Sequence, residues 1–277
     1  MAERELICSE VWGGNGSIVT ELQVPGMHGV LFSAACGGPK GGDVYYSSAC
    51  AAGVLARVCL ADVAGHGEAV SQLSTWLHES MRKTMLRIDP SRVFSMLNTQ
   101  VAGFGETTLA TAACLSFDAM SGNLRYCYAG HPPVLVKRAN KPKWEPLSIE
   151  SKRDASVRNV PLGVVDHAKF DVAVEQLNPG DRLFLYSDGV TEAPDAQGAQ
   201  FGADGLLAFL NENSARNLTG IVEALGERLK SYSGVDSFRH DDVSFFLFEV
   251  LPRPSHTKAY YLFTNQLRRL RKKLQPA

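Results

Sequence analysis

Residues 54–67 read Val-Leu-Ala-Arg-Val-Cys-Leu-Ala-Asp-Val-Ala-Gly-His-Gly. The first eight are apolar except for one arginine, which predicts a strand that ends at Asp62. The glycines that follow let the backbone bend sharply, as glycine has no Cβ to restrict it. Beyond Gly67 the apolar residues recur every three or four positions, which predicts a helix; they are Val70, Leu73, Leu77, Met81 and Met85. The stretch therefore places an acidic side chain between a buried strand and an amphipathic helix.

Three more aspartates lie beside predicted strands: Asp43 after two glycines, Asp188 after the apolar run 183–186, and Asp241 before the strand 243–250. Carboxylates that folding brings together repel one another and raise one another's pKa unless a cation lies among them. Oxygen ligands suit hard divalent ions such as Mg²⁺ and Mn²⁺. The first hypothesis from the residues is therefore a metal-assisted hydrolase.

The composition is that of an ordinary globular protein, with 277 residues, 45% apolar and 21% charged. No apolar run approaches the roughly 20 residues that cross a bilayer, and residues 1–6 do not resemble a secretory signal. The six cysteines are far apart and include no Cys-x-x-Cys pair, so we expect reduced core residues. These features together predict a cytoplasmic protein.

The net charge of -1 conceals an uneven distribution. Residues 253–277 contain seven Lys or Arg and no acid, which leaves 21 bases against 29 acids, or -8, in residues 1–252. An acidic body argues against nucleic acid as the substrate. We therefore expect residues 1–252 to form the catalytic domain and residues 253–277 to form a separate basic tail.

The tail carries a one-sided apolar stripe at helical spacing, formed by Tyr260, Phe263, Leu267, Leu270 and Leu274. Such a helix is compatible with docking on the protein's own body or with a homodimer seam. Its basic face is equally compatible with an anionic membrane or an acidic partner. The sequence leaves these alternatives open.

The remaining pattern predicts an α+β domain with antiparallel sheets, because strands cluster as hairpins and helices come in separate pairs. Pro90 marks the first turn of a second helix. We expect a three-stranded meander over 108–138 and a strand from Phe170 to Glu175. Two further helices are expected near 203–213 and 218–232.

Taken together, the motifs resemble the metal-dependent protein phosphatase (PPM) family, in its bacterial SpoIIE-type serine/threonine branch. The resemblance covers roughly residues 10–250 and rests on six motifs in order. They are Gly41-Gly42-Asp43, Asp62-Val63-Ala64-Gly65-His66-Gly67, Ala129-Gly130-His131-Pro132-Pro133, Pro161-Leu162-Gly163, Ser187-Asp188-Gly189-Val190-Thr191-Glu192 and Asp241-Asp242-Val243-Ser244. Each motif alone is weakly specific, whereas six in order make a strong signal.

The resemblance implies a four-layer αββα sandwich of two antiparallel sheets with helices on both outer faces. It implies two Mn²⁺ or Mg²⁺ ions, bridged by Asp62 and completed by the Val63 carbonyl, Asp188 and Asp241, with Asp43 binding directly or through water. A water activated by the two metal ions would attack a phosphoserine or phosphothreonine. The implied substrate is a phosphoprotein, in relatives often an anti-sigma factor antagonist with a STAS fold.

Three positions leave alternatives open. Tyr46 stands where relatives often carry an acid, which raises the alternative of a weak pseudophosphatase that binds a phosphoprotein without turning it over. His66 could donate a proton to the leaving oxygen, or could only pack at the helix start. Lys40 could attract phosphate or be a solvated loop residue. In the closing motif we expect Asp241 to be the ligand and Asp242 to hydrogen-bond behind it.

Overall fold

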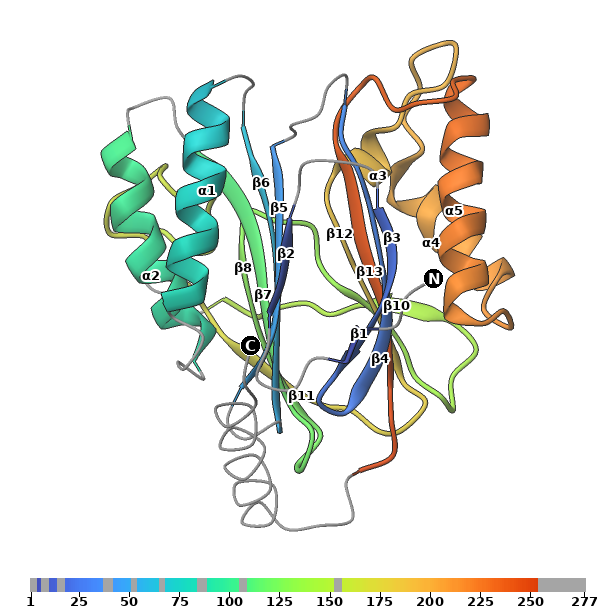
Figure 1. Cartoon of the computed structure of the whole chain (residues 1–277), viewed down its shortest axis with the longest axis horizontal. Coiled ribbons are helices and arrows are strands. Elements are labelled where there is room, and N and C mark those ends of the chain that lie inside the picture. Colours follow the sequence, from blue (N-terminus) through green and yellow to red (C-terminus); the bar gives the residue numbers. More distant parts are fainter. Residues whose placement is uncertain are drawn as a thin grey trace, which may run out of the picture.

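The computed structural model describes residues 4–5, 10–13, 18–36, 42–50, 54–64, 68–83, 89–104, 109–151 and 156–253. Lys40, His66 and the predicted tail helix lie outside these ranges, so their predictions stay untested. The described elements form four layers, in which two sheets face each other and helices cover both outer faces (Figure 1). The predicted αββα sandwich is confirmed.

One sheet has seven strands among the described residues. Their order is β1 (Arg4–Glu5), β3 (Ile18–Val24), β4 (Met27–Ala34), β13 (Val243–Val250), β12 (Arg182–Tyr186), β9 (Leu135–Lys137) and β10 (Trp144–Pro146). All neighbours pair antiparallel except β1, which runs parallel to β3 over two residues. This sheet carries Asp188 and Asp241 at the ends of adjacent strands.

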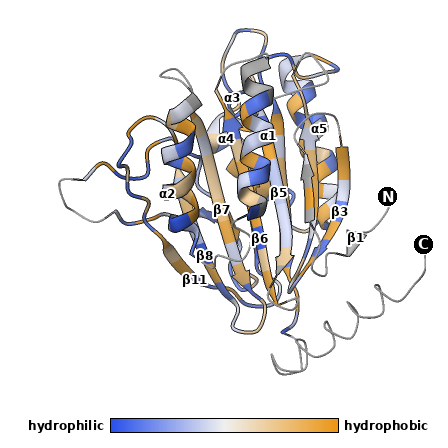
Figure 2. Ribbon diagram, turned by 60° about the vertical axis from the view of Figure 1, so that its left-hand side comes forward, coloured by the Kyte–Doolittle hydropathy of each residue, from blue (hydrophilic) through white to orange (hydrophobic). Residues whose placement is uncertain are grey.

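The other sheet has six strands among the described residues, all antiparallel. Their order is β11 (Ala173–Gln176), β8 (Asn123–Ala129), β7 (Ala110–Asp118), β6 (Leu55–Val63), β5 (Asp43–Cys50) and β2 (Glu10–Gly13). The strand predicted to end at Asp62 is therefore β6, at the centre of this sheet. Helix α2 lies over the outer face of the same sheet (Figure 2) and buries Val93, Phe94, Leu97 and Val101, which recur at helical spacing.

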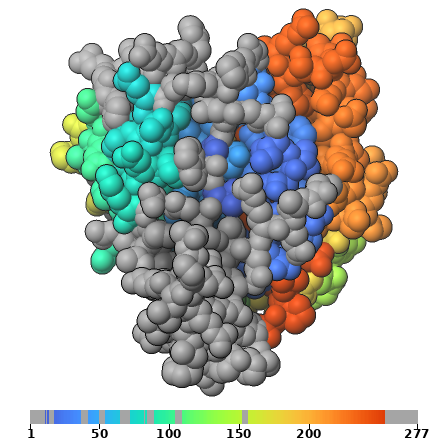
Figure 3. Space-filling model, in the orientation of Figure 1, coloured from blue at the N-terminus to red at the C-terminus, as the bar shows by residue number. Residues whose placement is uncertain are grey.

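The helices form the two outer layers. Those described are α1 (Glu68–Lys83), α2 (Pro90–Val101), the 3-10 turn η1 (Ala102–Phe104), α3 (Gly189–Glu192), α4 (Gly202–Glu212) and α5 (Leu218–Ser233). In Figure 3 the helix pair α1–α2 and helix α5 lie on opposite sides, with the N-terminal strands between them. No described helix has both the length and the apolar character needed to cross a bilayer.

Three apolar cores hold the layers together. The core between the sheets includes Leu31, Val58, Leu60, Leu115 and Phe246. A second core joins the seven-stranded sheet to α4 and α5, and a third joins the six-stranded sheet to α1 and α2. Side chains alternate across a strand, so β6 supplies Val58 and Leu60 to the first core and Cys59 and Ala61 to the third.

Local sequence explains where the second helix begins and what it holds. The Asp89 side chain accepts the backbone N–H of Ser91 at 3.0 Å, which caps α2 directly before Pro90. Buried Asn98 donates to the carbonyls of Val165 (2.8 Å) and Asp166 (3.1 Å) and accepts the N–H of Gly163 (2.9 Å). Helix α2 is thereby tied to the loop that carries the Pro161-Leu162-Gly163 motif.

Two sequence expectations differ from the structure. The segment 108–138 does contain three strands, but β9 leaves β8 and pairs with β12 in the other sheet, so it is no meander. Pro132 and Pro133 have no N–H to continue the β8 ladder, which explains the crossing. The strand expected from Phe170 begins only at Ala173, after Asp171 has turned its carboxylate toward Arg158 (2.7 Å).

Three of the four cysteines whose side chains are described agree with the expectation of reduced core residues, and Cys36 is only partly buried. Cys36, Cys59, Cys114 and Cys127 are all free thiols. The last three are buried on the adjacent strands β6, β7 and β8, beneath the α1–α2 layer.

Candidate metal centre

The two sheets bring four predicted ligands to one end of the sandwich. Asp43 of β5 lies directly opposite Asp62 of β6 in the antiparallel ladder. In the facing sheet, Asp188 follows the end of β12 and Asp241 precedes β13, and these strand ends are joined by the Ser187 N–H to Ser244 carbonyl bond of 2.9 Å. We call Asp43, Asp62, Asp188 and Asp241 the acidic quartet.

A side-chain hydrogen bond between Ser187 and Asp43 links the two sheets at this point. The Ser187 hydroxyl donates to Asp43 Oδ2 at 2.8 Å, and Ser187 Oγ accepts the Ser244 N–H at 3.0 Å. Asp43 is 1% exposed, and its Oδ1 has no hydrogen-bond partner in the described part of the chain. Burial first, and the charge of Asp62 second, raise the pKa of Asp43 well above its ordinary value. A cation would compensate this orphaned carboxylate oxygen.

Ser187→Ala is expected to destabilise the protein by about 1–3 kcal/mol, because buried Asp43 would lose a hydrogen-bond donor. Urea unfolding measures the difference. The control is Ser95→Ala, since that exposed hydroxyl donates only to the Ser91 carbonyl of the same helix (2.9 Å) and should matter by less than about 0.5 kcal/mol. Equal stability of the two variants would contradict the role given to Ser187.

The pKa of Asp62 is strongly raised. Burial, then the charges of Asp188 and Asp241, raise its pKa from 3.8 to about 7. Repulsion between carboxylates therefore reaches across the sandwich from one sheet to the other. An uncompensated arrangement of this kind is a feature of functional sites.

The pKa values of Asp188 and Asp241 are also raised, in both cases mainly by burial. The next cause is Glu192 for Asp188. For Asp241, a hydrogen bond from the Asp242 N–H (2.8 Å) opposes the rise and the charge of Asp188 adds to it. Both side chains are only partly buried, so they face the open end of the sandwich.

Asp242 has a different task from its neighbour. Its buried carboxylate accepts backbone N–H groups of Cys36 (2.5 Å), Asp43 (3.2 Å) and Gly42. These donors flank residues 37–41 on both sides, so one side chain fastens both ends of the glycine-rich segment. Its oxygens are thus engaged by the backbone, and Asp241 remains the predicted ligand.

The Val63 carbonyl lies beside the same group. A Cβ atom at Gly42 would lie 2.7 Å from the Val63 oxygen and 3.3 Å from Asp62 Oδ1. Any larger residue at this position would fill the space next to both oxygens, which gives a physical reason for glycine before Asp43. The Val63 N–H is held by the Gly42 carbonyl at 3.3 Å.

The donor set fits a hard divalent cation in chemistry, since it offers carboxylate oxygens, one carbonyl and an orphaned buried oxygen. In the ranges that the structure describes, no three His, Cys, Asp or Glu side chains converge closely enough to hold one ion between them. The quartet comes together as the cross-strand pair Asp43–Asp62 and the loop pair Asp188–Asp241, with Asp62 in electrostatic reach of the latter.

Tyr46 does not belong to this group. Because it lies three residues along β5 from Asp43, it points to the opposite face of the sheet. It is fully buried there under α1, with its ring 6.0 Å from that of His78. An acid at position 46 would also face the helices, so Tyr46 removes no ligand from the acidic quartet.

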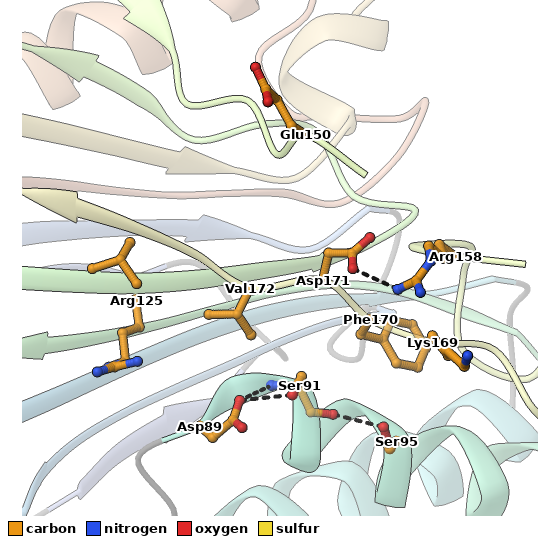
Figure 4. A pocket seen from close by; sticks show the side chains of 11 residues that line it. Asp89, Ser91, Ser95, Arg125, Glu150, Arg158, Lys169, Phe170, Asp171 and Val172 are labelled. Atoms are coloured by element: carbon orange, nitrogen blue, oxygen red, sulfur yellow. Dashed lines mark hydrogen bonds and ion pairs between the residues drawn. The ribbon is translucent and has the colours of Figure 1, made fainter. Parts of the chain in front are cut away.

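A separate cavity of about 730 Å³ lies between the start of α2 and β11 (Figure 4). Its walls carry charges of both signs, and some of them are already satisfied. Arg158 pairs with Asp171, and Asp89 caps α2. No member of the acidic quartet lines this cavity, so it is distinct from the candidate metal centre.

Sequence reasoning missed Ser187 and Ser244, and it predicted hydrogen bonding by Asp242 without its partners Cys36, Gly42 and Asp43. Ser187, Ser244 and Asp242 each stand within a motif that was recognised, so their positions were in view but their partners were not. Ser187 and Asp43 are 144 residues apart, and no local pattern predicts which hydroxyl a buried carboxylate will accept.

The chain was compared with known proteins. It is 25% identical to stage II sporulation protein E of Priestia megaterium over 168 residues, which is 60% of this chain and 27% of that protein. The chain thus matches about a quarter of the length of this curated relative.

Two solved structures resemble the fold. The RsbU and RsbW domains of Rv1364c from Mycobacterium tuberculosis superpose with a TM-score of 0.66 at 23% identity, covering 87% of this chain and 64% of that one. RsbX in complex with magnesium gives 0.62 at 15% identity, covering 84% and 100%.

A family model described as stage II sporulation protein E (SpoIIE) matches residues 55–251. This segment runs from β6 through β13 and includes Asp62, Asp188 and Asp241. Because the match covers well over half of the chain, the protein belongs to the SpoIIE family of serine protein phosphatases.

Proposed function

We propose that this chain is a Mn²⁺- or Mg²⁺-dependent serine/threonine protein phosphatase. The observation that carries the proposal is the acidic quartet, which four segments distant in sequence bring to one end of the sandwich. Family membership supports the reaction class, and the structural likeness to RsbX, solved with magnesium, is consistent with the choice of cation.

In this proposal Asp62, Asp188, Asp241, Asp43 and the Val63 carbonyl would hold the two ions. Bound ions would supply Lewis acidity and lower the pKa of a coordinated water. The chain's own part is to hold the carboxylates in place. Ser187 orients Asp43, the Asp242 N–H orients Asp241, and the Asp242 carboxylate fixes the segment before Asp43.

The substrate we propose is a phosphoserine or phosphothreonine in a protein partner, of the STAS-type regulator class. This choice of substrate is supported only by analogy, because one protein of similar fold carries an RsbU and an RsbW domain in one chain. The pseudophosphatase alternative was motivated by Tyr46, and that residue packs in the core away from the quartet. No observation now favours it.

The test is hydrolysis of p-nitrophenyl phosphate and of a phosphoserine peptide, each measured with Mn²⁺, with Mg²⁺ and with EDTA. We expect turnover with either metal and none with EDTA, restored by excess Mn²⁺. Undiminished turnover in EDTA would refute the metal dependence. Tight binding of Mn²⁺ without turnover of either compound would refute the phosphatase assignment.

A further inference from the structure

His240 stands directly before Asp241, yet its ring reaches the other ligand-bearing loop. Its Nε2 lies 2.8 Å from the carbonyl oxygen of Gly189, the residue after Asp188. A carbonyl only accepts hydrogen bonds, so Nε2 carries the proton and donates it. This side-chain hydrogen bond joins the Asp188 loop to the Asp241 loop.

Backbone N–H groups close to this bond face the two carboxylates. Asp241 Oδ1 accepts the Asp242 N–H at 2.8 Å, and the Gly189 N–H opposes the rise in the pKa of Asp188. The two loops are in direct backbone contact as well, since a Cβ at Gly189 would lie 1.9 Å from the Asp242 carbonyl oxygen. A shift of one loop against the other would therefore move both carboxylates.

His240 is itself anchored to the core. The ring of Phe238 meets it edge to face, with centroids 6.1 Å apart and an interplanar angle of 83°. Phe238 is 3% exposed and meets Phe32 of β4 in the same way, at 6.2 Å and 82°. A continuous series of contacts thus runs from the apolar core through His240 to the Gly189 carbonyl.

We propose that His240 is a positioning residue that fixes the spacing of Asp188 and Asp241 and thereby sets the affinity of the centre for divalent metal. Its Nε2 proton is held by the Gly189 carbonyl, which assigns it to geometry and not to proton transfer. The inference rests on the proposed function for the identity of the ligands. Residues that orient metal ligands commonly change metal affinity by about 10- to 100-fold when replaced.

The experiment compares His240→Gln with His240→Met in the full chain. Glutamine keeps an N–H donor at similar reach, whereas methionine has similar length and no donor. Mn²⁺ binding is measured by titration calorimetry without substrate, and thermal unfolding in EDTA shows that each variant is folded. The matched control is His167→Met, because His167 is exposed and remote in sequence from the quartet.

We expect methionine to raise the Kd for Mn²⁺ by about tenfold or more, glutamine to stay within about threefold of the wild type, and the His167 control to be unchanged. A methionine variant that binds Mn²⁺ like the wild type would overturn the inference and leave the proposed function standing. A glutamine variant as weak as the methionine variant would also overturn it, because packing and not the hydrogen bond would then matter. A wild-type chain that binds no Mn²⁺ would instead overturn the proposed function.

Should His240→Met fail to fold in EDTA, His240→Phe keeps an aromatic ring beside Phe238 and removes the donor. The same outcomes then apply to the phenylalanine variant, whose ring retains the edge-to-face contact.

Discussion

Asp62→Asn is expected to reduce Mn²⁺-dependent hydrolysis of p-nitrophenyl phosphate by more than about 100-fold in kcat/KM, while the metal-free protein stays folded. Asparagine keeps the shape of the side chain and removes the charge that the proposed ions require. The loss should not be rescued by raising Mn²⁺ to millimolar levels. Activity of Asp62→Asn within about threefold of the wild type would show that Asp62 is not a ligand of the proposed metal centre.

The same substitution should change how the metal-free protein responds to pH. The folded-state pKa of Asp62 is about 7, whereas the ordinary value is 3.8. Between these values the folded state binds more protons than the unfolded state, so stability falls as pH rises. The penalty is absent below about pH 4, complete above about pH 7, and on the order of a few kcal/mol. Neutral asparagine lacks this penalty.

Urea unfolding in EDTA at pH 5 and pH 8 measures this effect. We expect the wild type to lose more stability than Asp62→Asn on going to pH 8, and Mn²⁺ to restore stability at pH 8 in the wild type alone. The control is Asp236→Asn, at an exposed position, which should follow the wild type. Parallel pH profiles for the wild type and Asp62→Asn would contradict the raised pKa.

Gly189→Ala should be the most damaging single-methyl change in the described part of the chain. The added Cβ would lie 1.9 Å from the carbonyl oxygen of Asp242, a backbone atom that cannot rotate away. One loop must then move, at a cost of about 3 kcal/mol or more, with loss of the geometry between Asp188 and Asp241. Thermal unfolding and Mn²⁺ titration should both register the change.

Gly103→Ala is the matched control for this prediction. Gly103 lies in η1 and is exposed, and a Cβ added there would meet no described atom within 4 Å. Alanine at this position should be neutral or slightly stabilising, because it reduces the freedom of the unfolded chain. If Gly189→Ala changes the stability no more than Gly103→Ala does, the close contact between Gly189 and the Asp242 carbonyl is contradicted.

Periodicity and turn residues were enough to predict the helices α1, α2, α4 and α5 and, to within one residue of its end at Val63, the strand β6. These elements follow local rules, such as Pro90 in a first turn and apolar residues at helical spacing. The order of the motifs then indicated the family and the αββα arrangement. Local rules could not place β9, because its partner β12 lies 45 residues farther along the chain. This pairing forms only when β12 is in the sheet and offers its free edge to β9.

The candidate site likewise has features that the sequence predicts and features that only the folded structure shows. Strand ends carrying acids could be recognised from the sequence, whereas the choice of Asp241 over Asp242 as the ligand stays a prediction. Successive side chains of a strand point to opposite faces, so Asp43 and Tyr46 face opposite sides of the sheet. That conclusion requires β5 to be a regular strand from Asp43 onward, which the structure shows and the sequence alone did not. The His240 and Ser187 contacts join residues 51 and 144 positions apart. The first exists only once β12 and β13 are paired, and the second only once the two sheets are stacked.

The hydrogen bond from the Ser187 hydroxyl to Asp43 makes the spacing of the proposed ligands depend on how the two sheets stack. A slip of one layer over the other, even by a fraction of a residue, would separate the halves of the centre before any helix or strand had melted. Heating should therefore extinguish catalysis at a lower temperature than it destroys secondary structure. The packing of the core between the two sheets therefore fixes the distances between the proposed ligands.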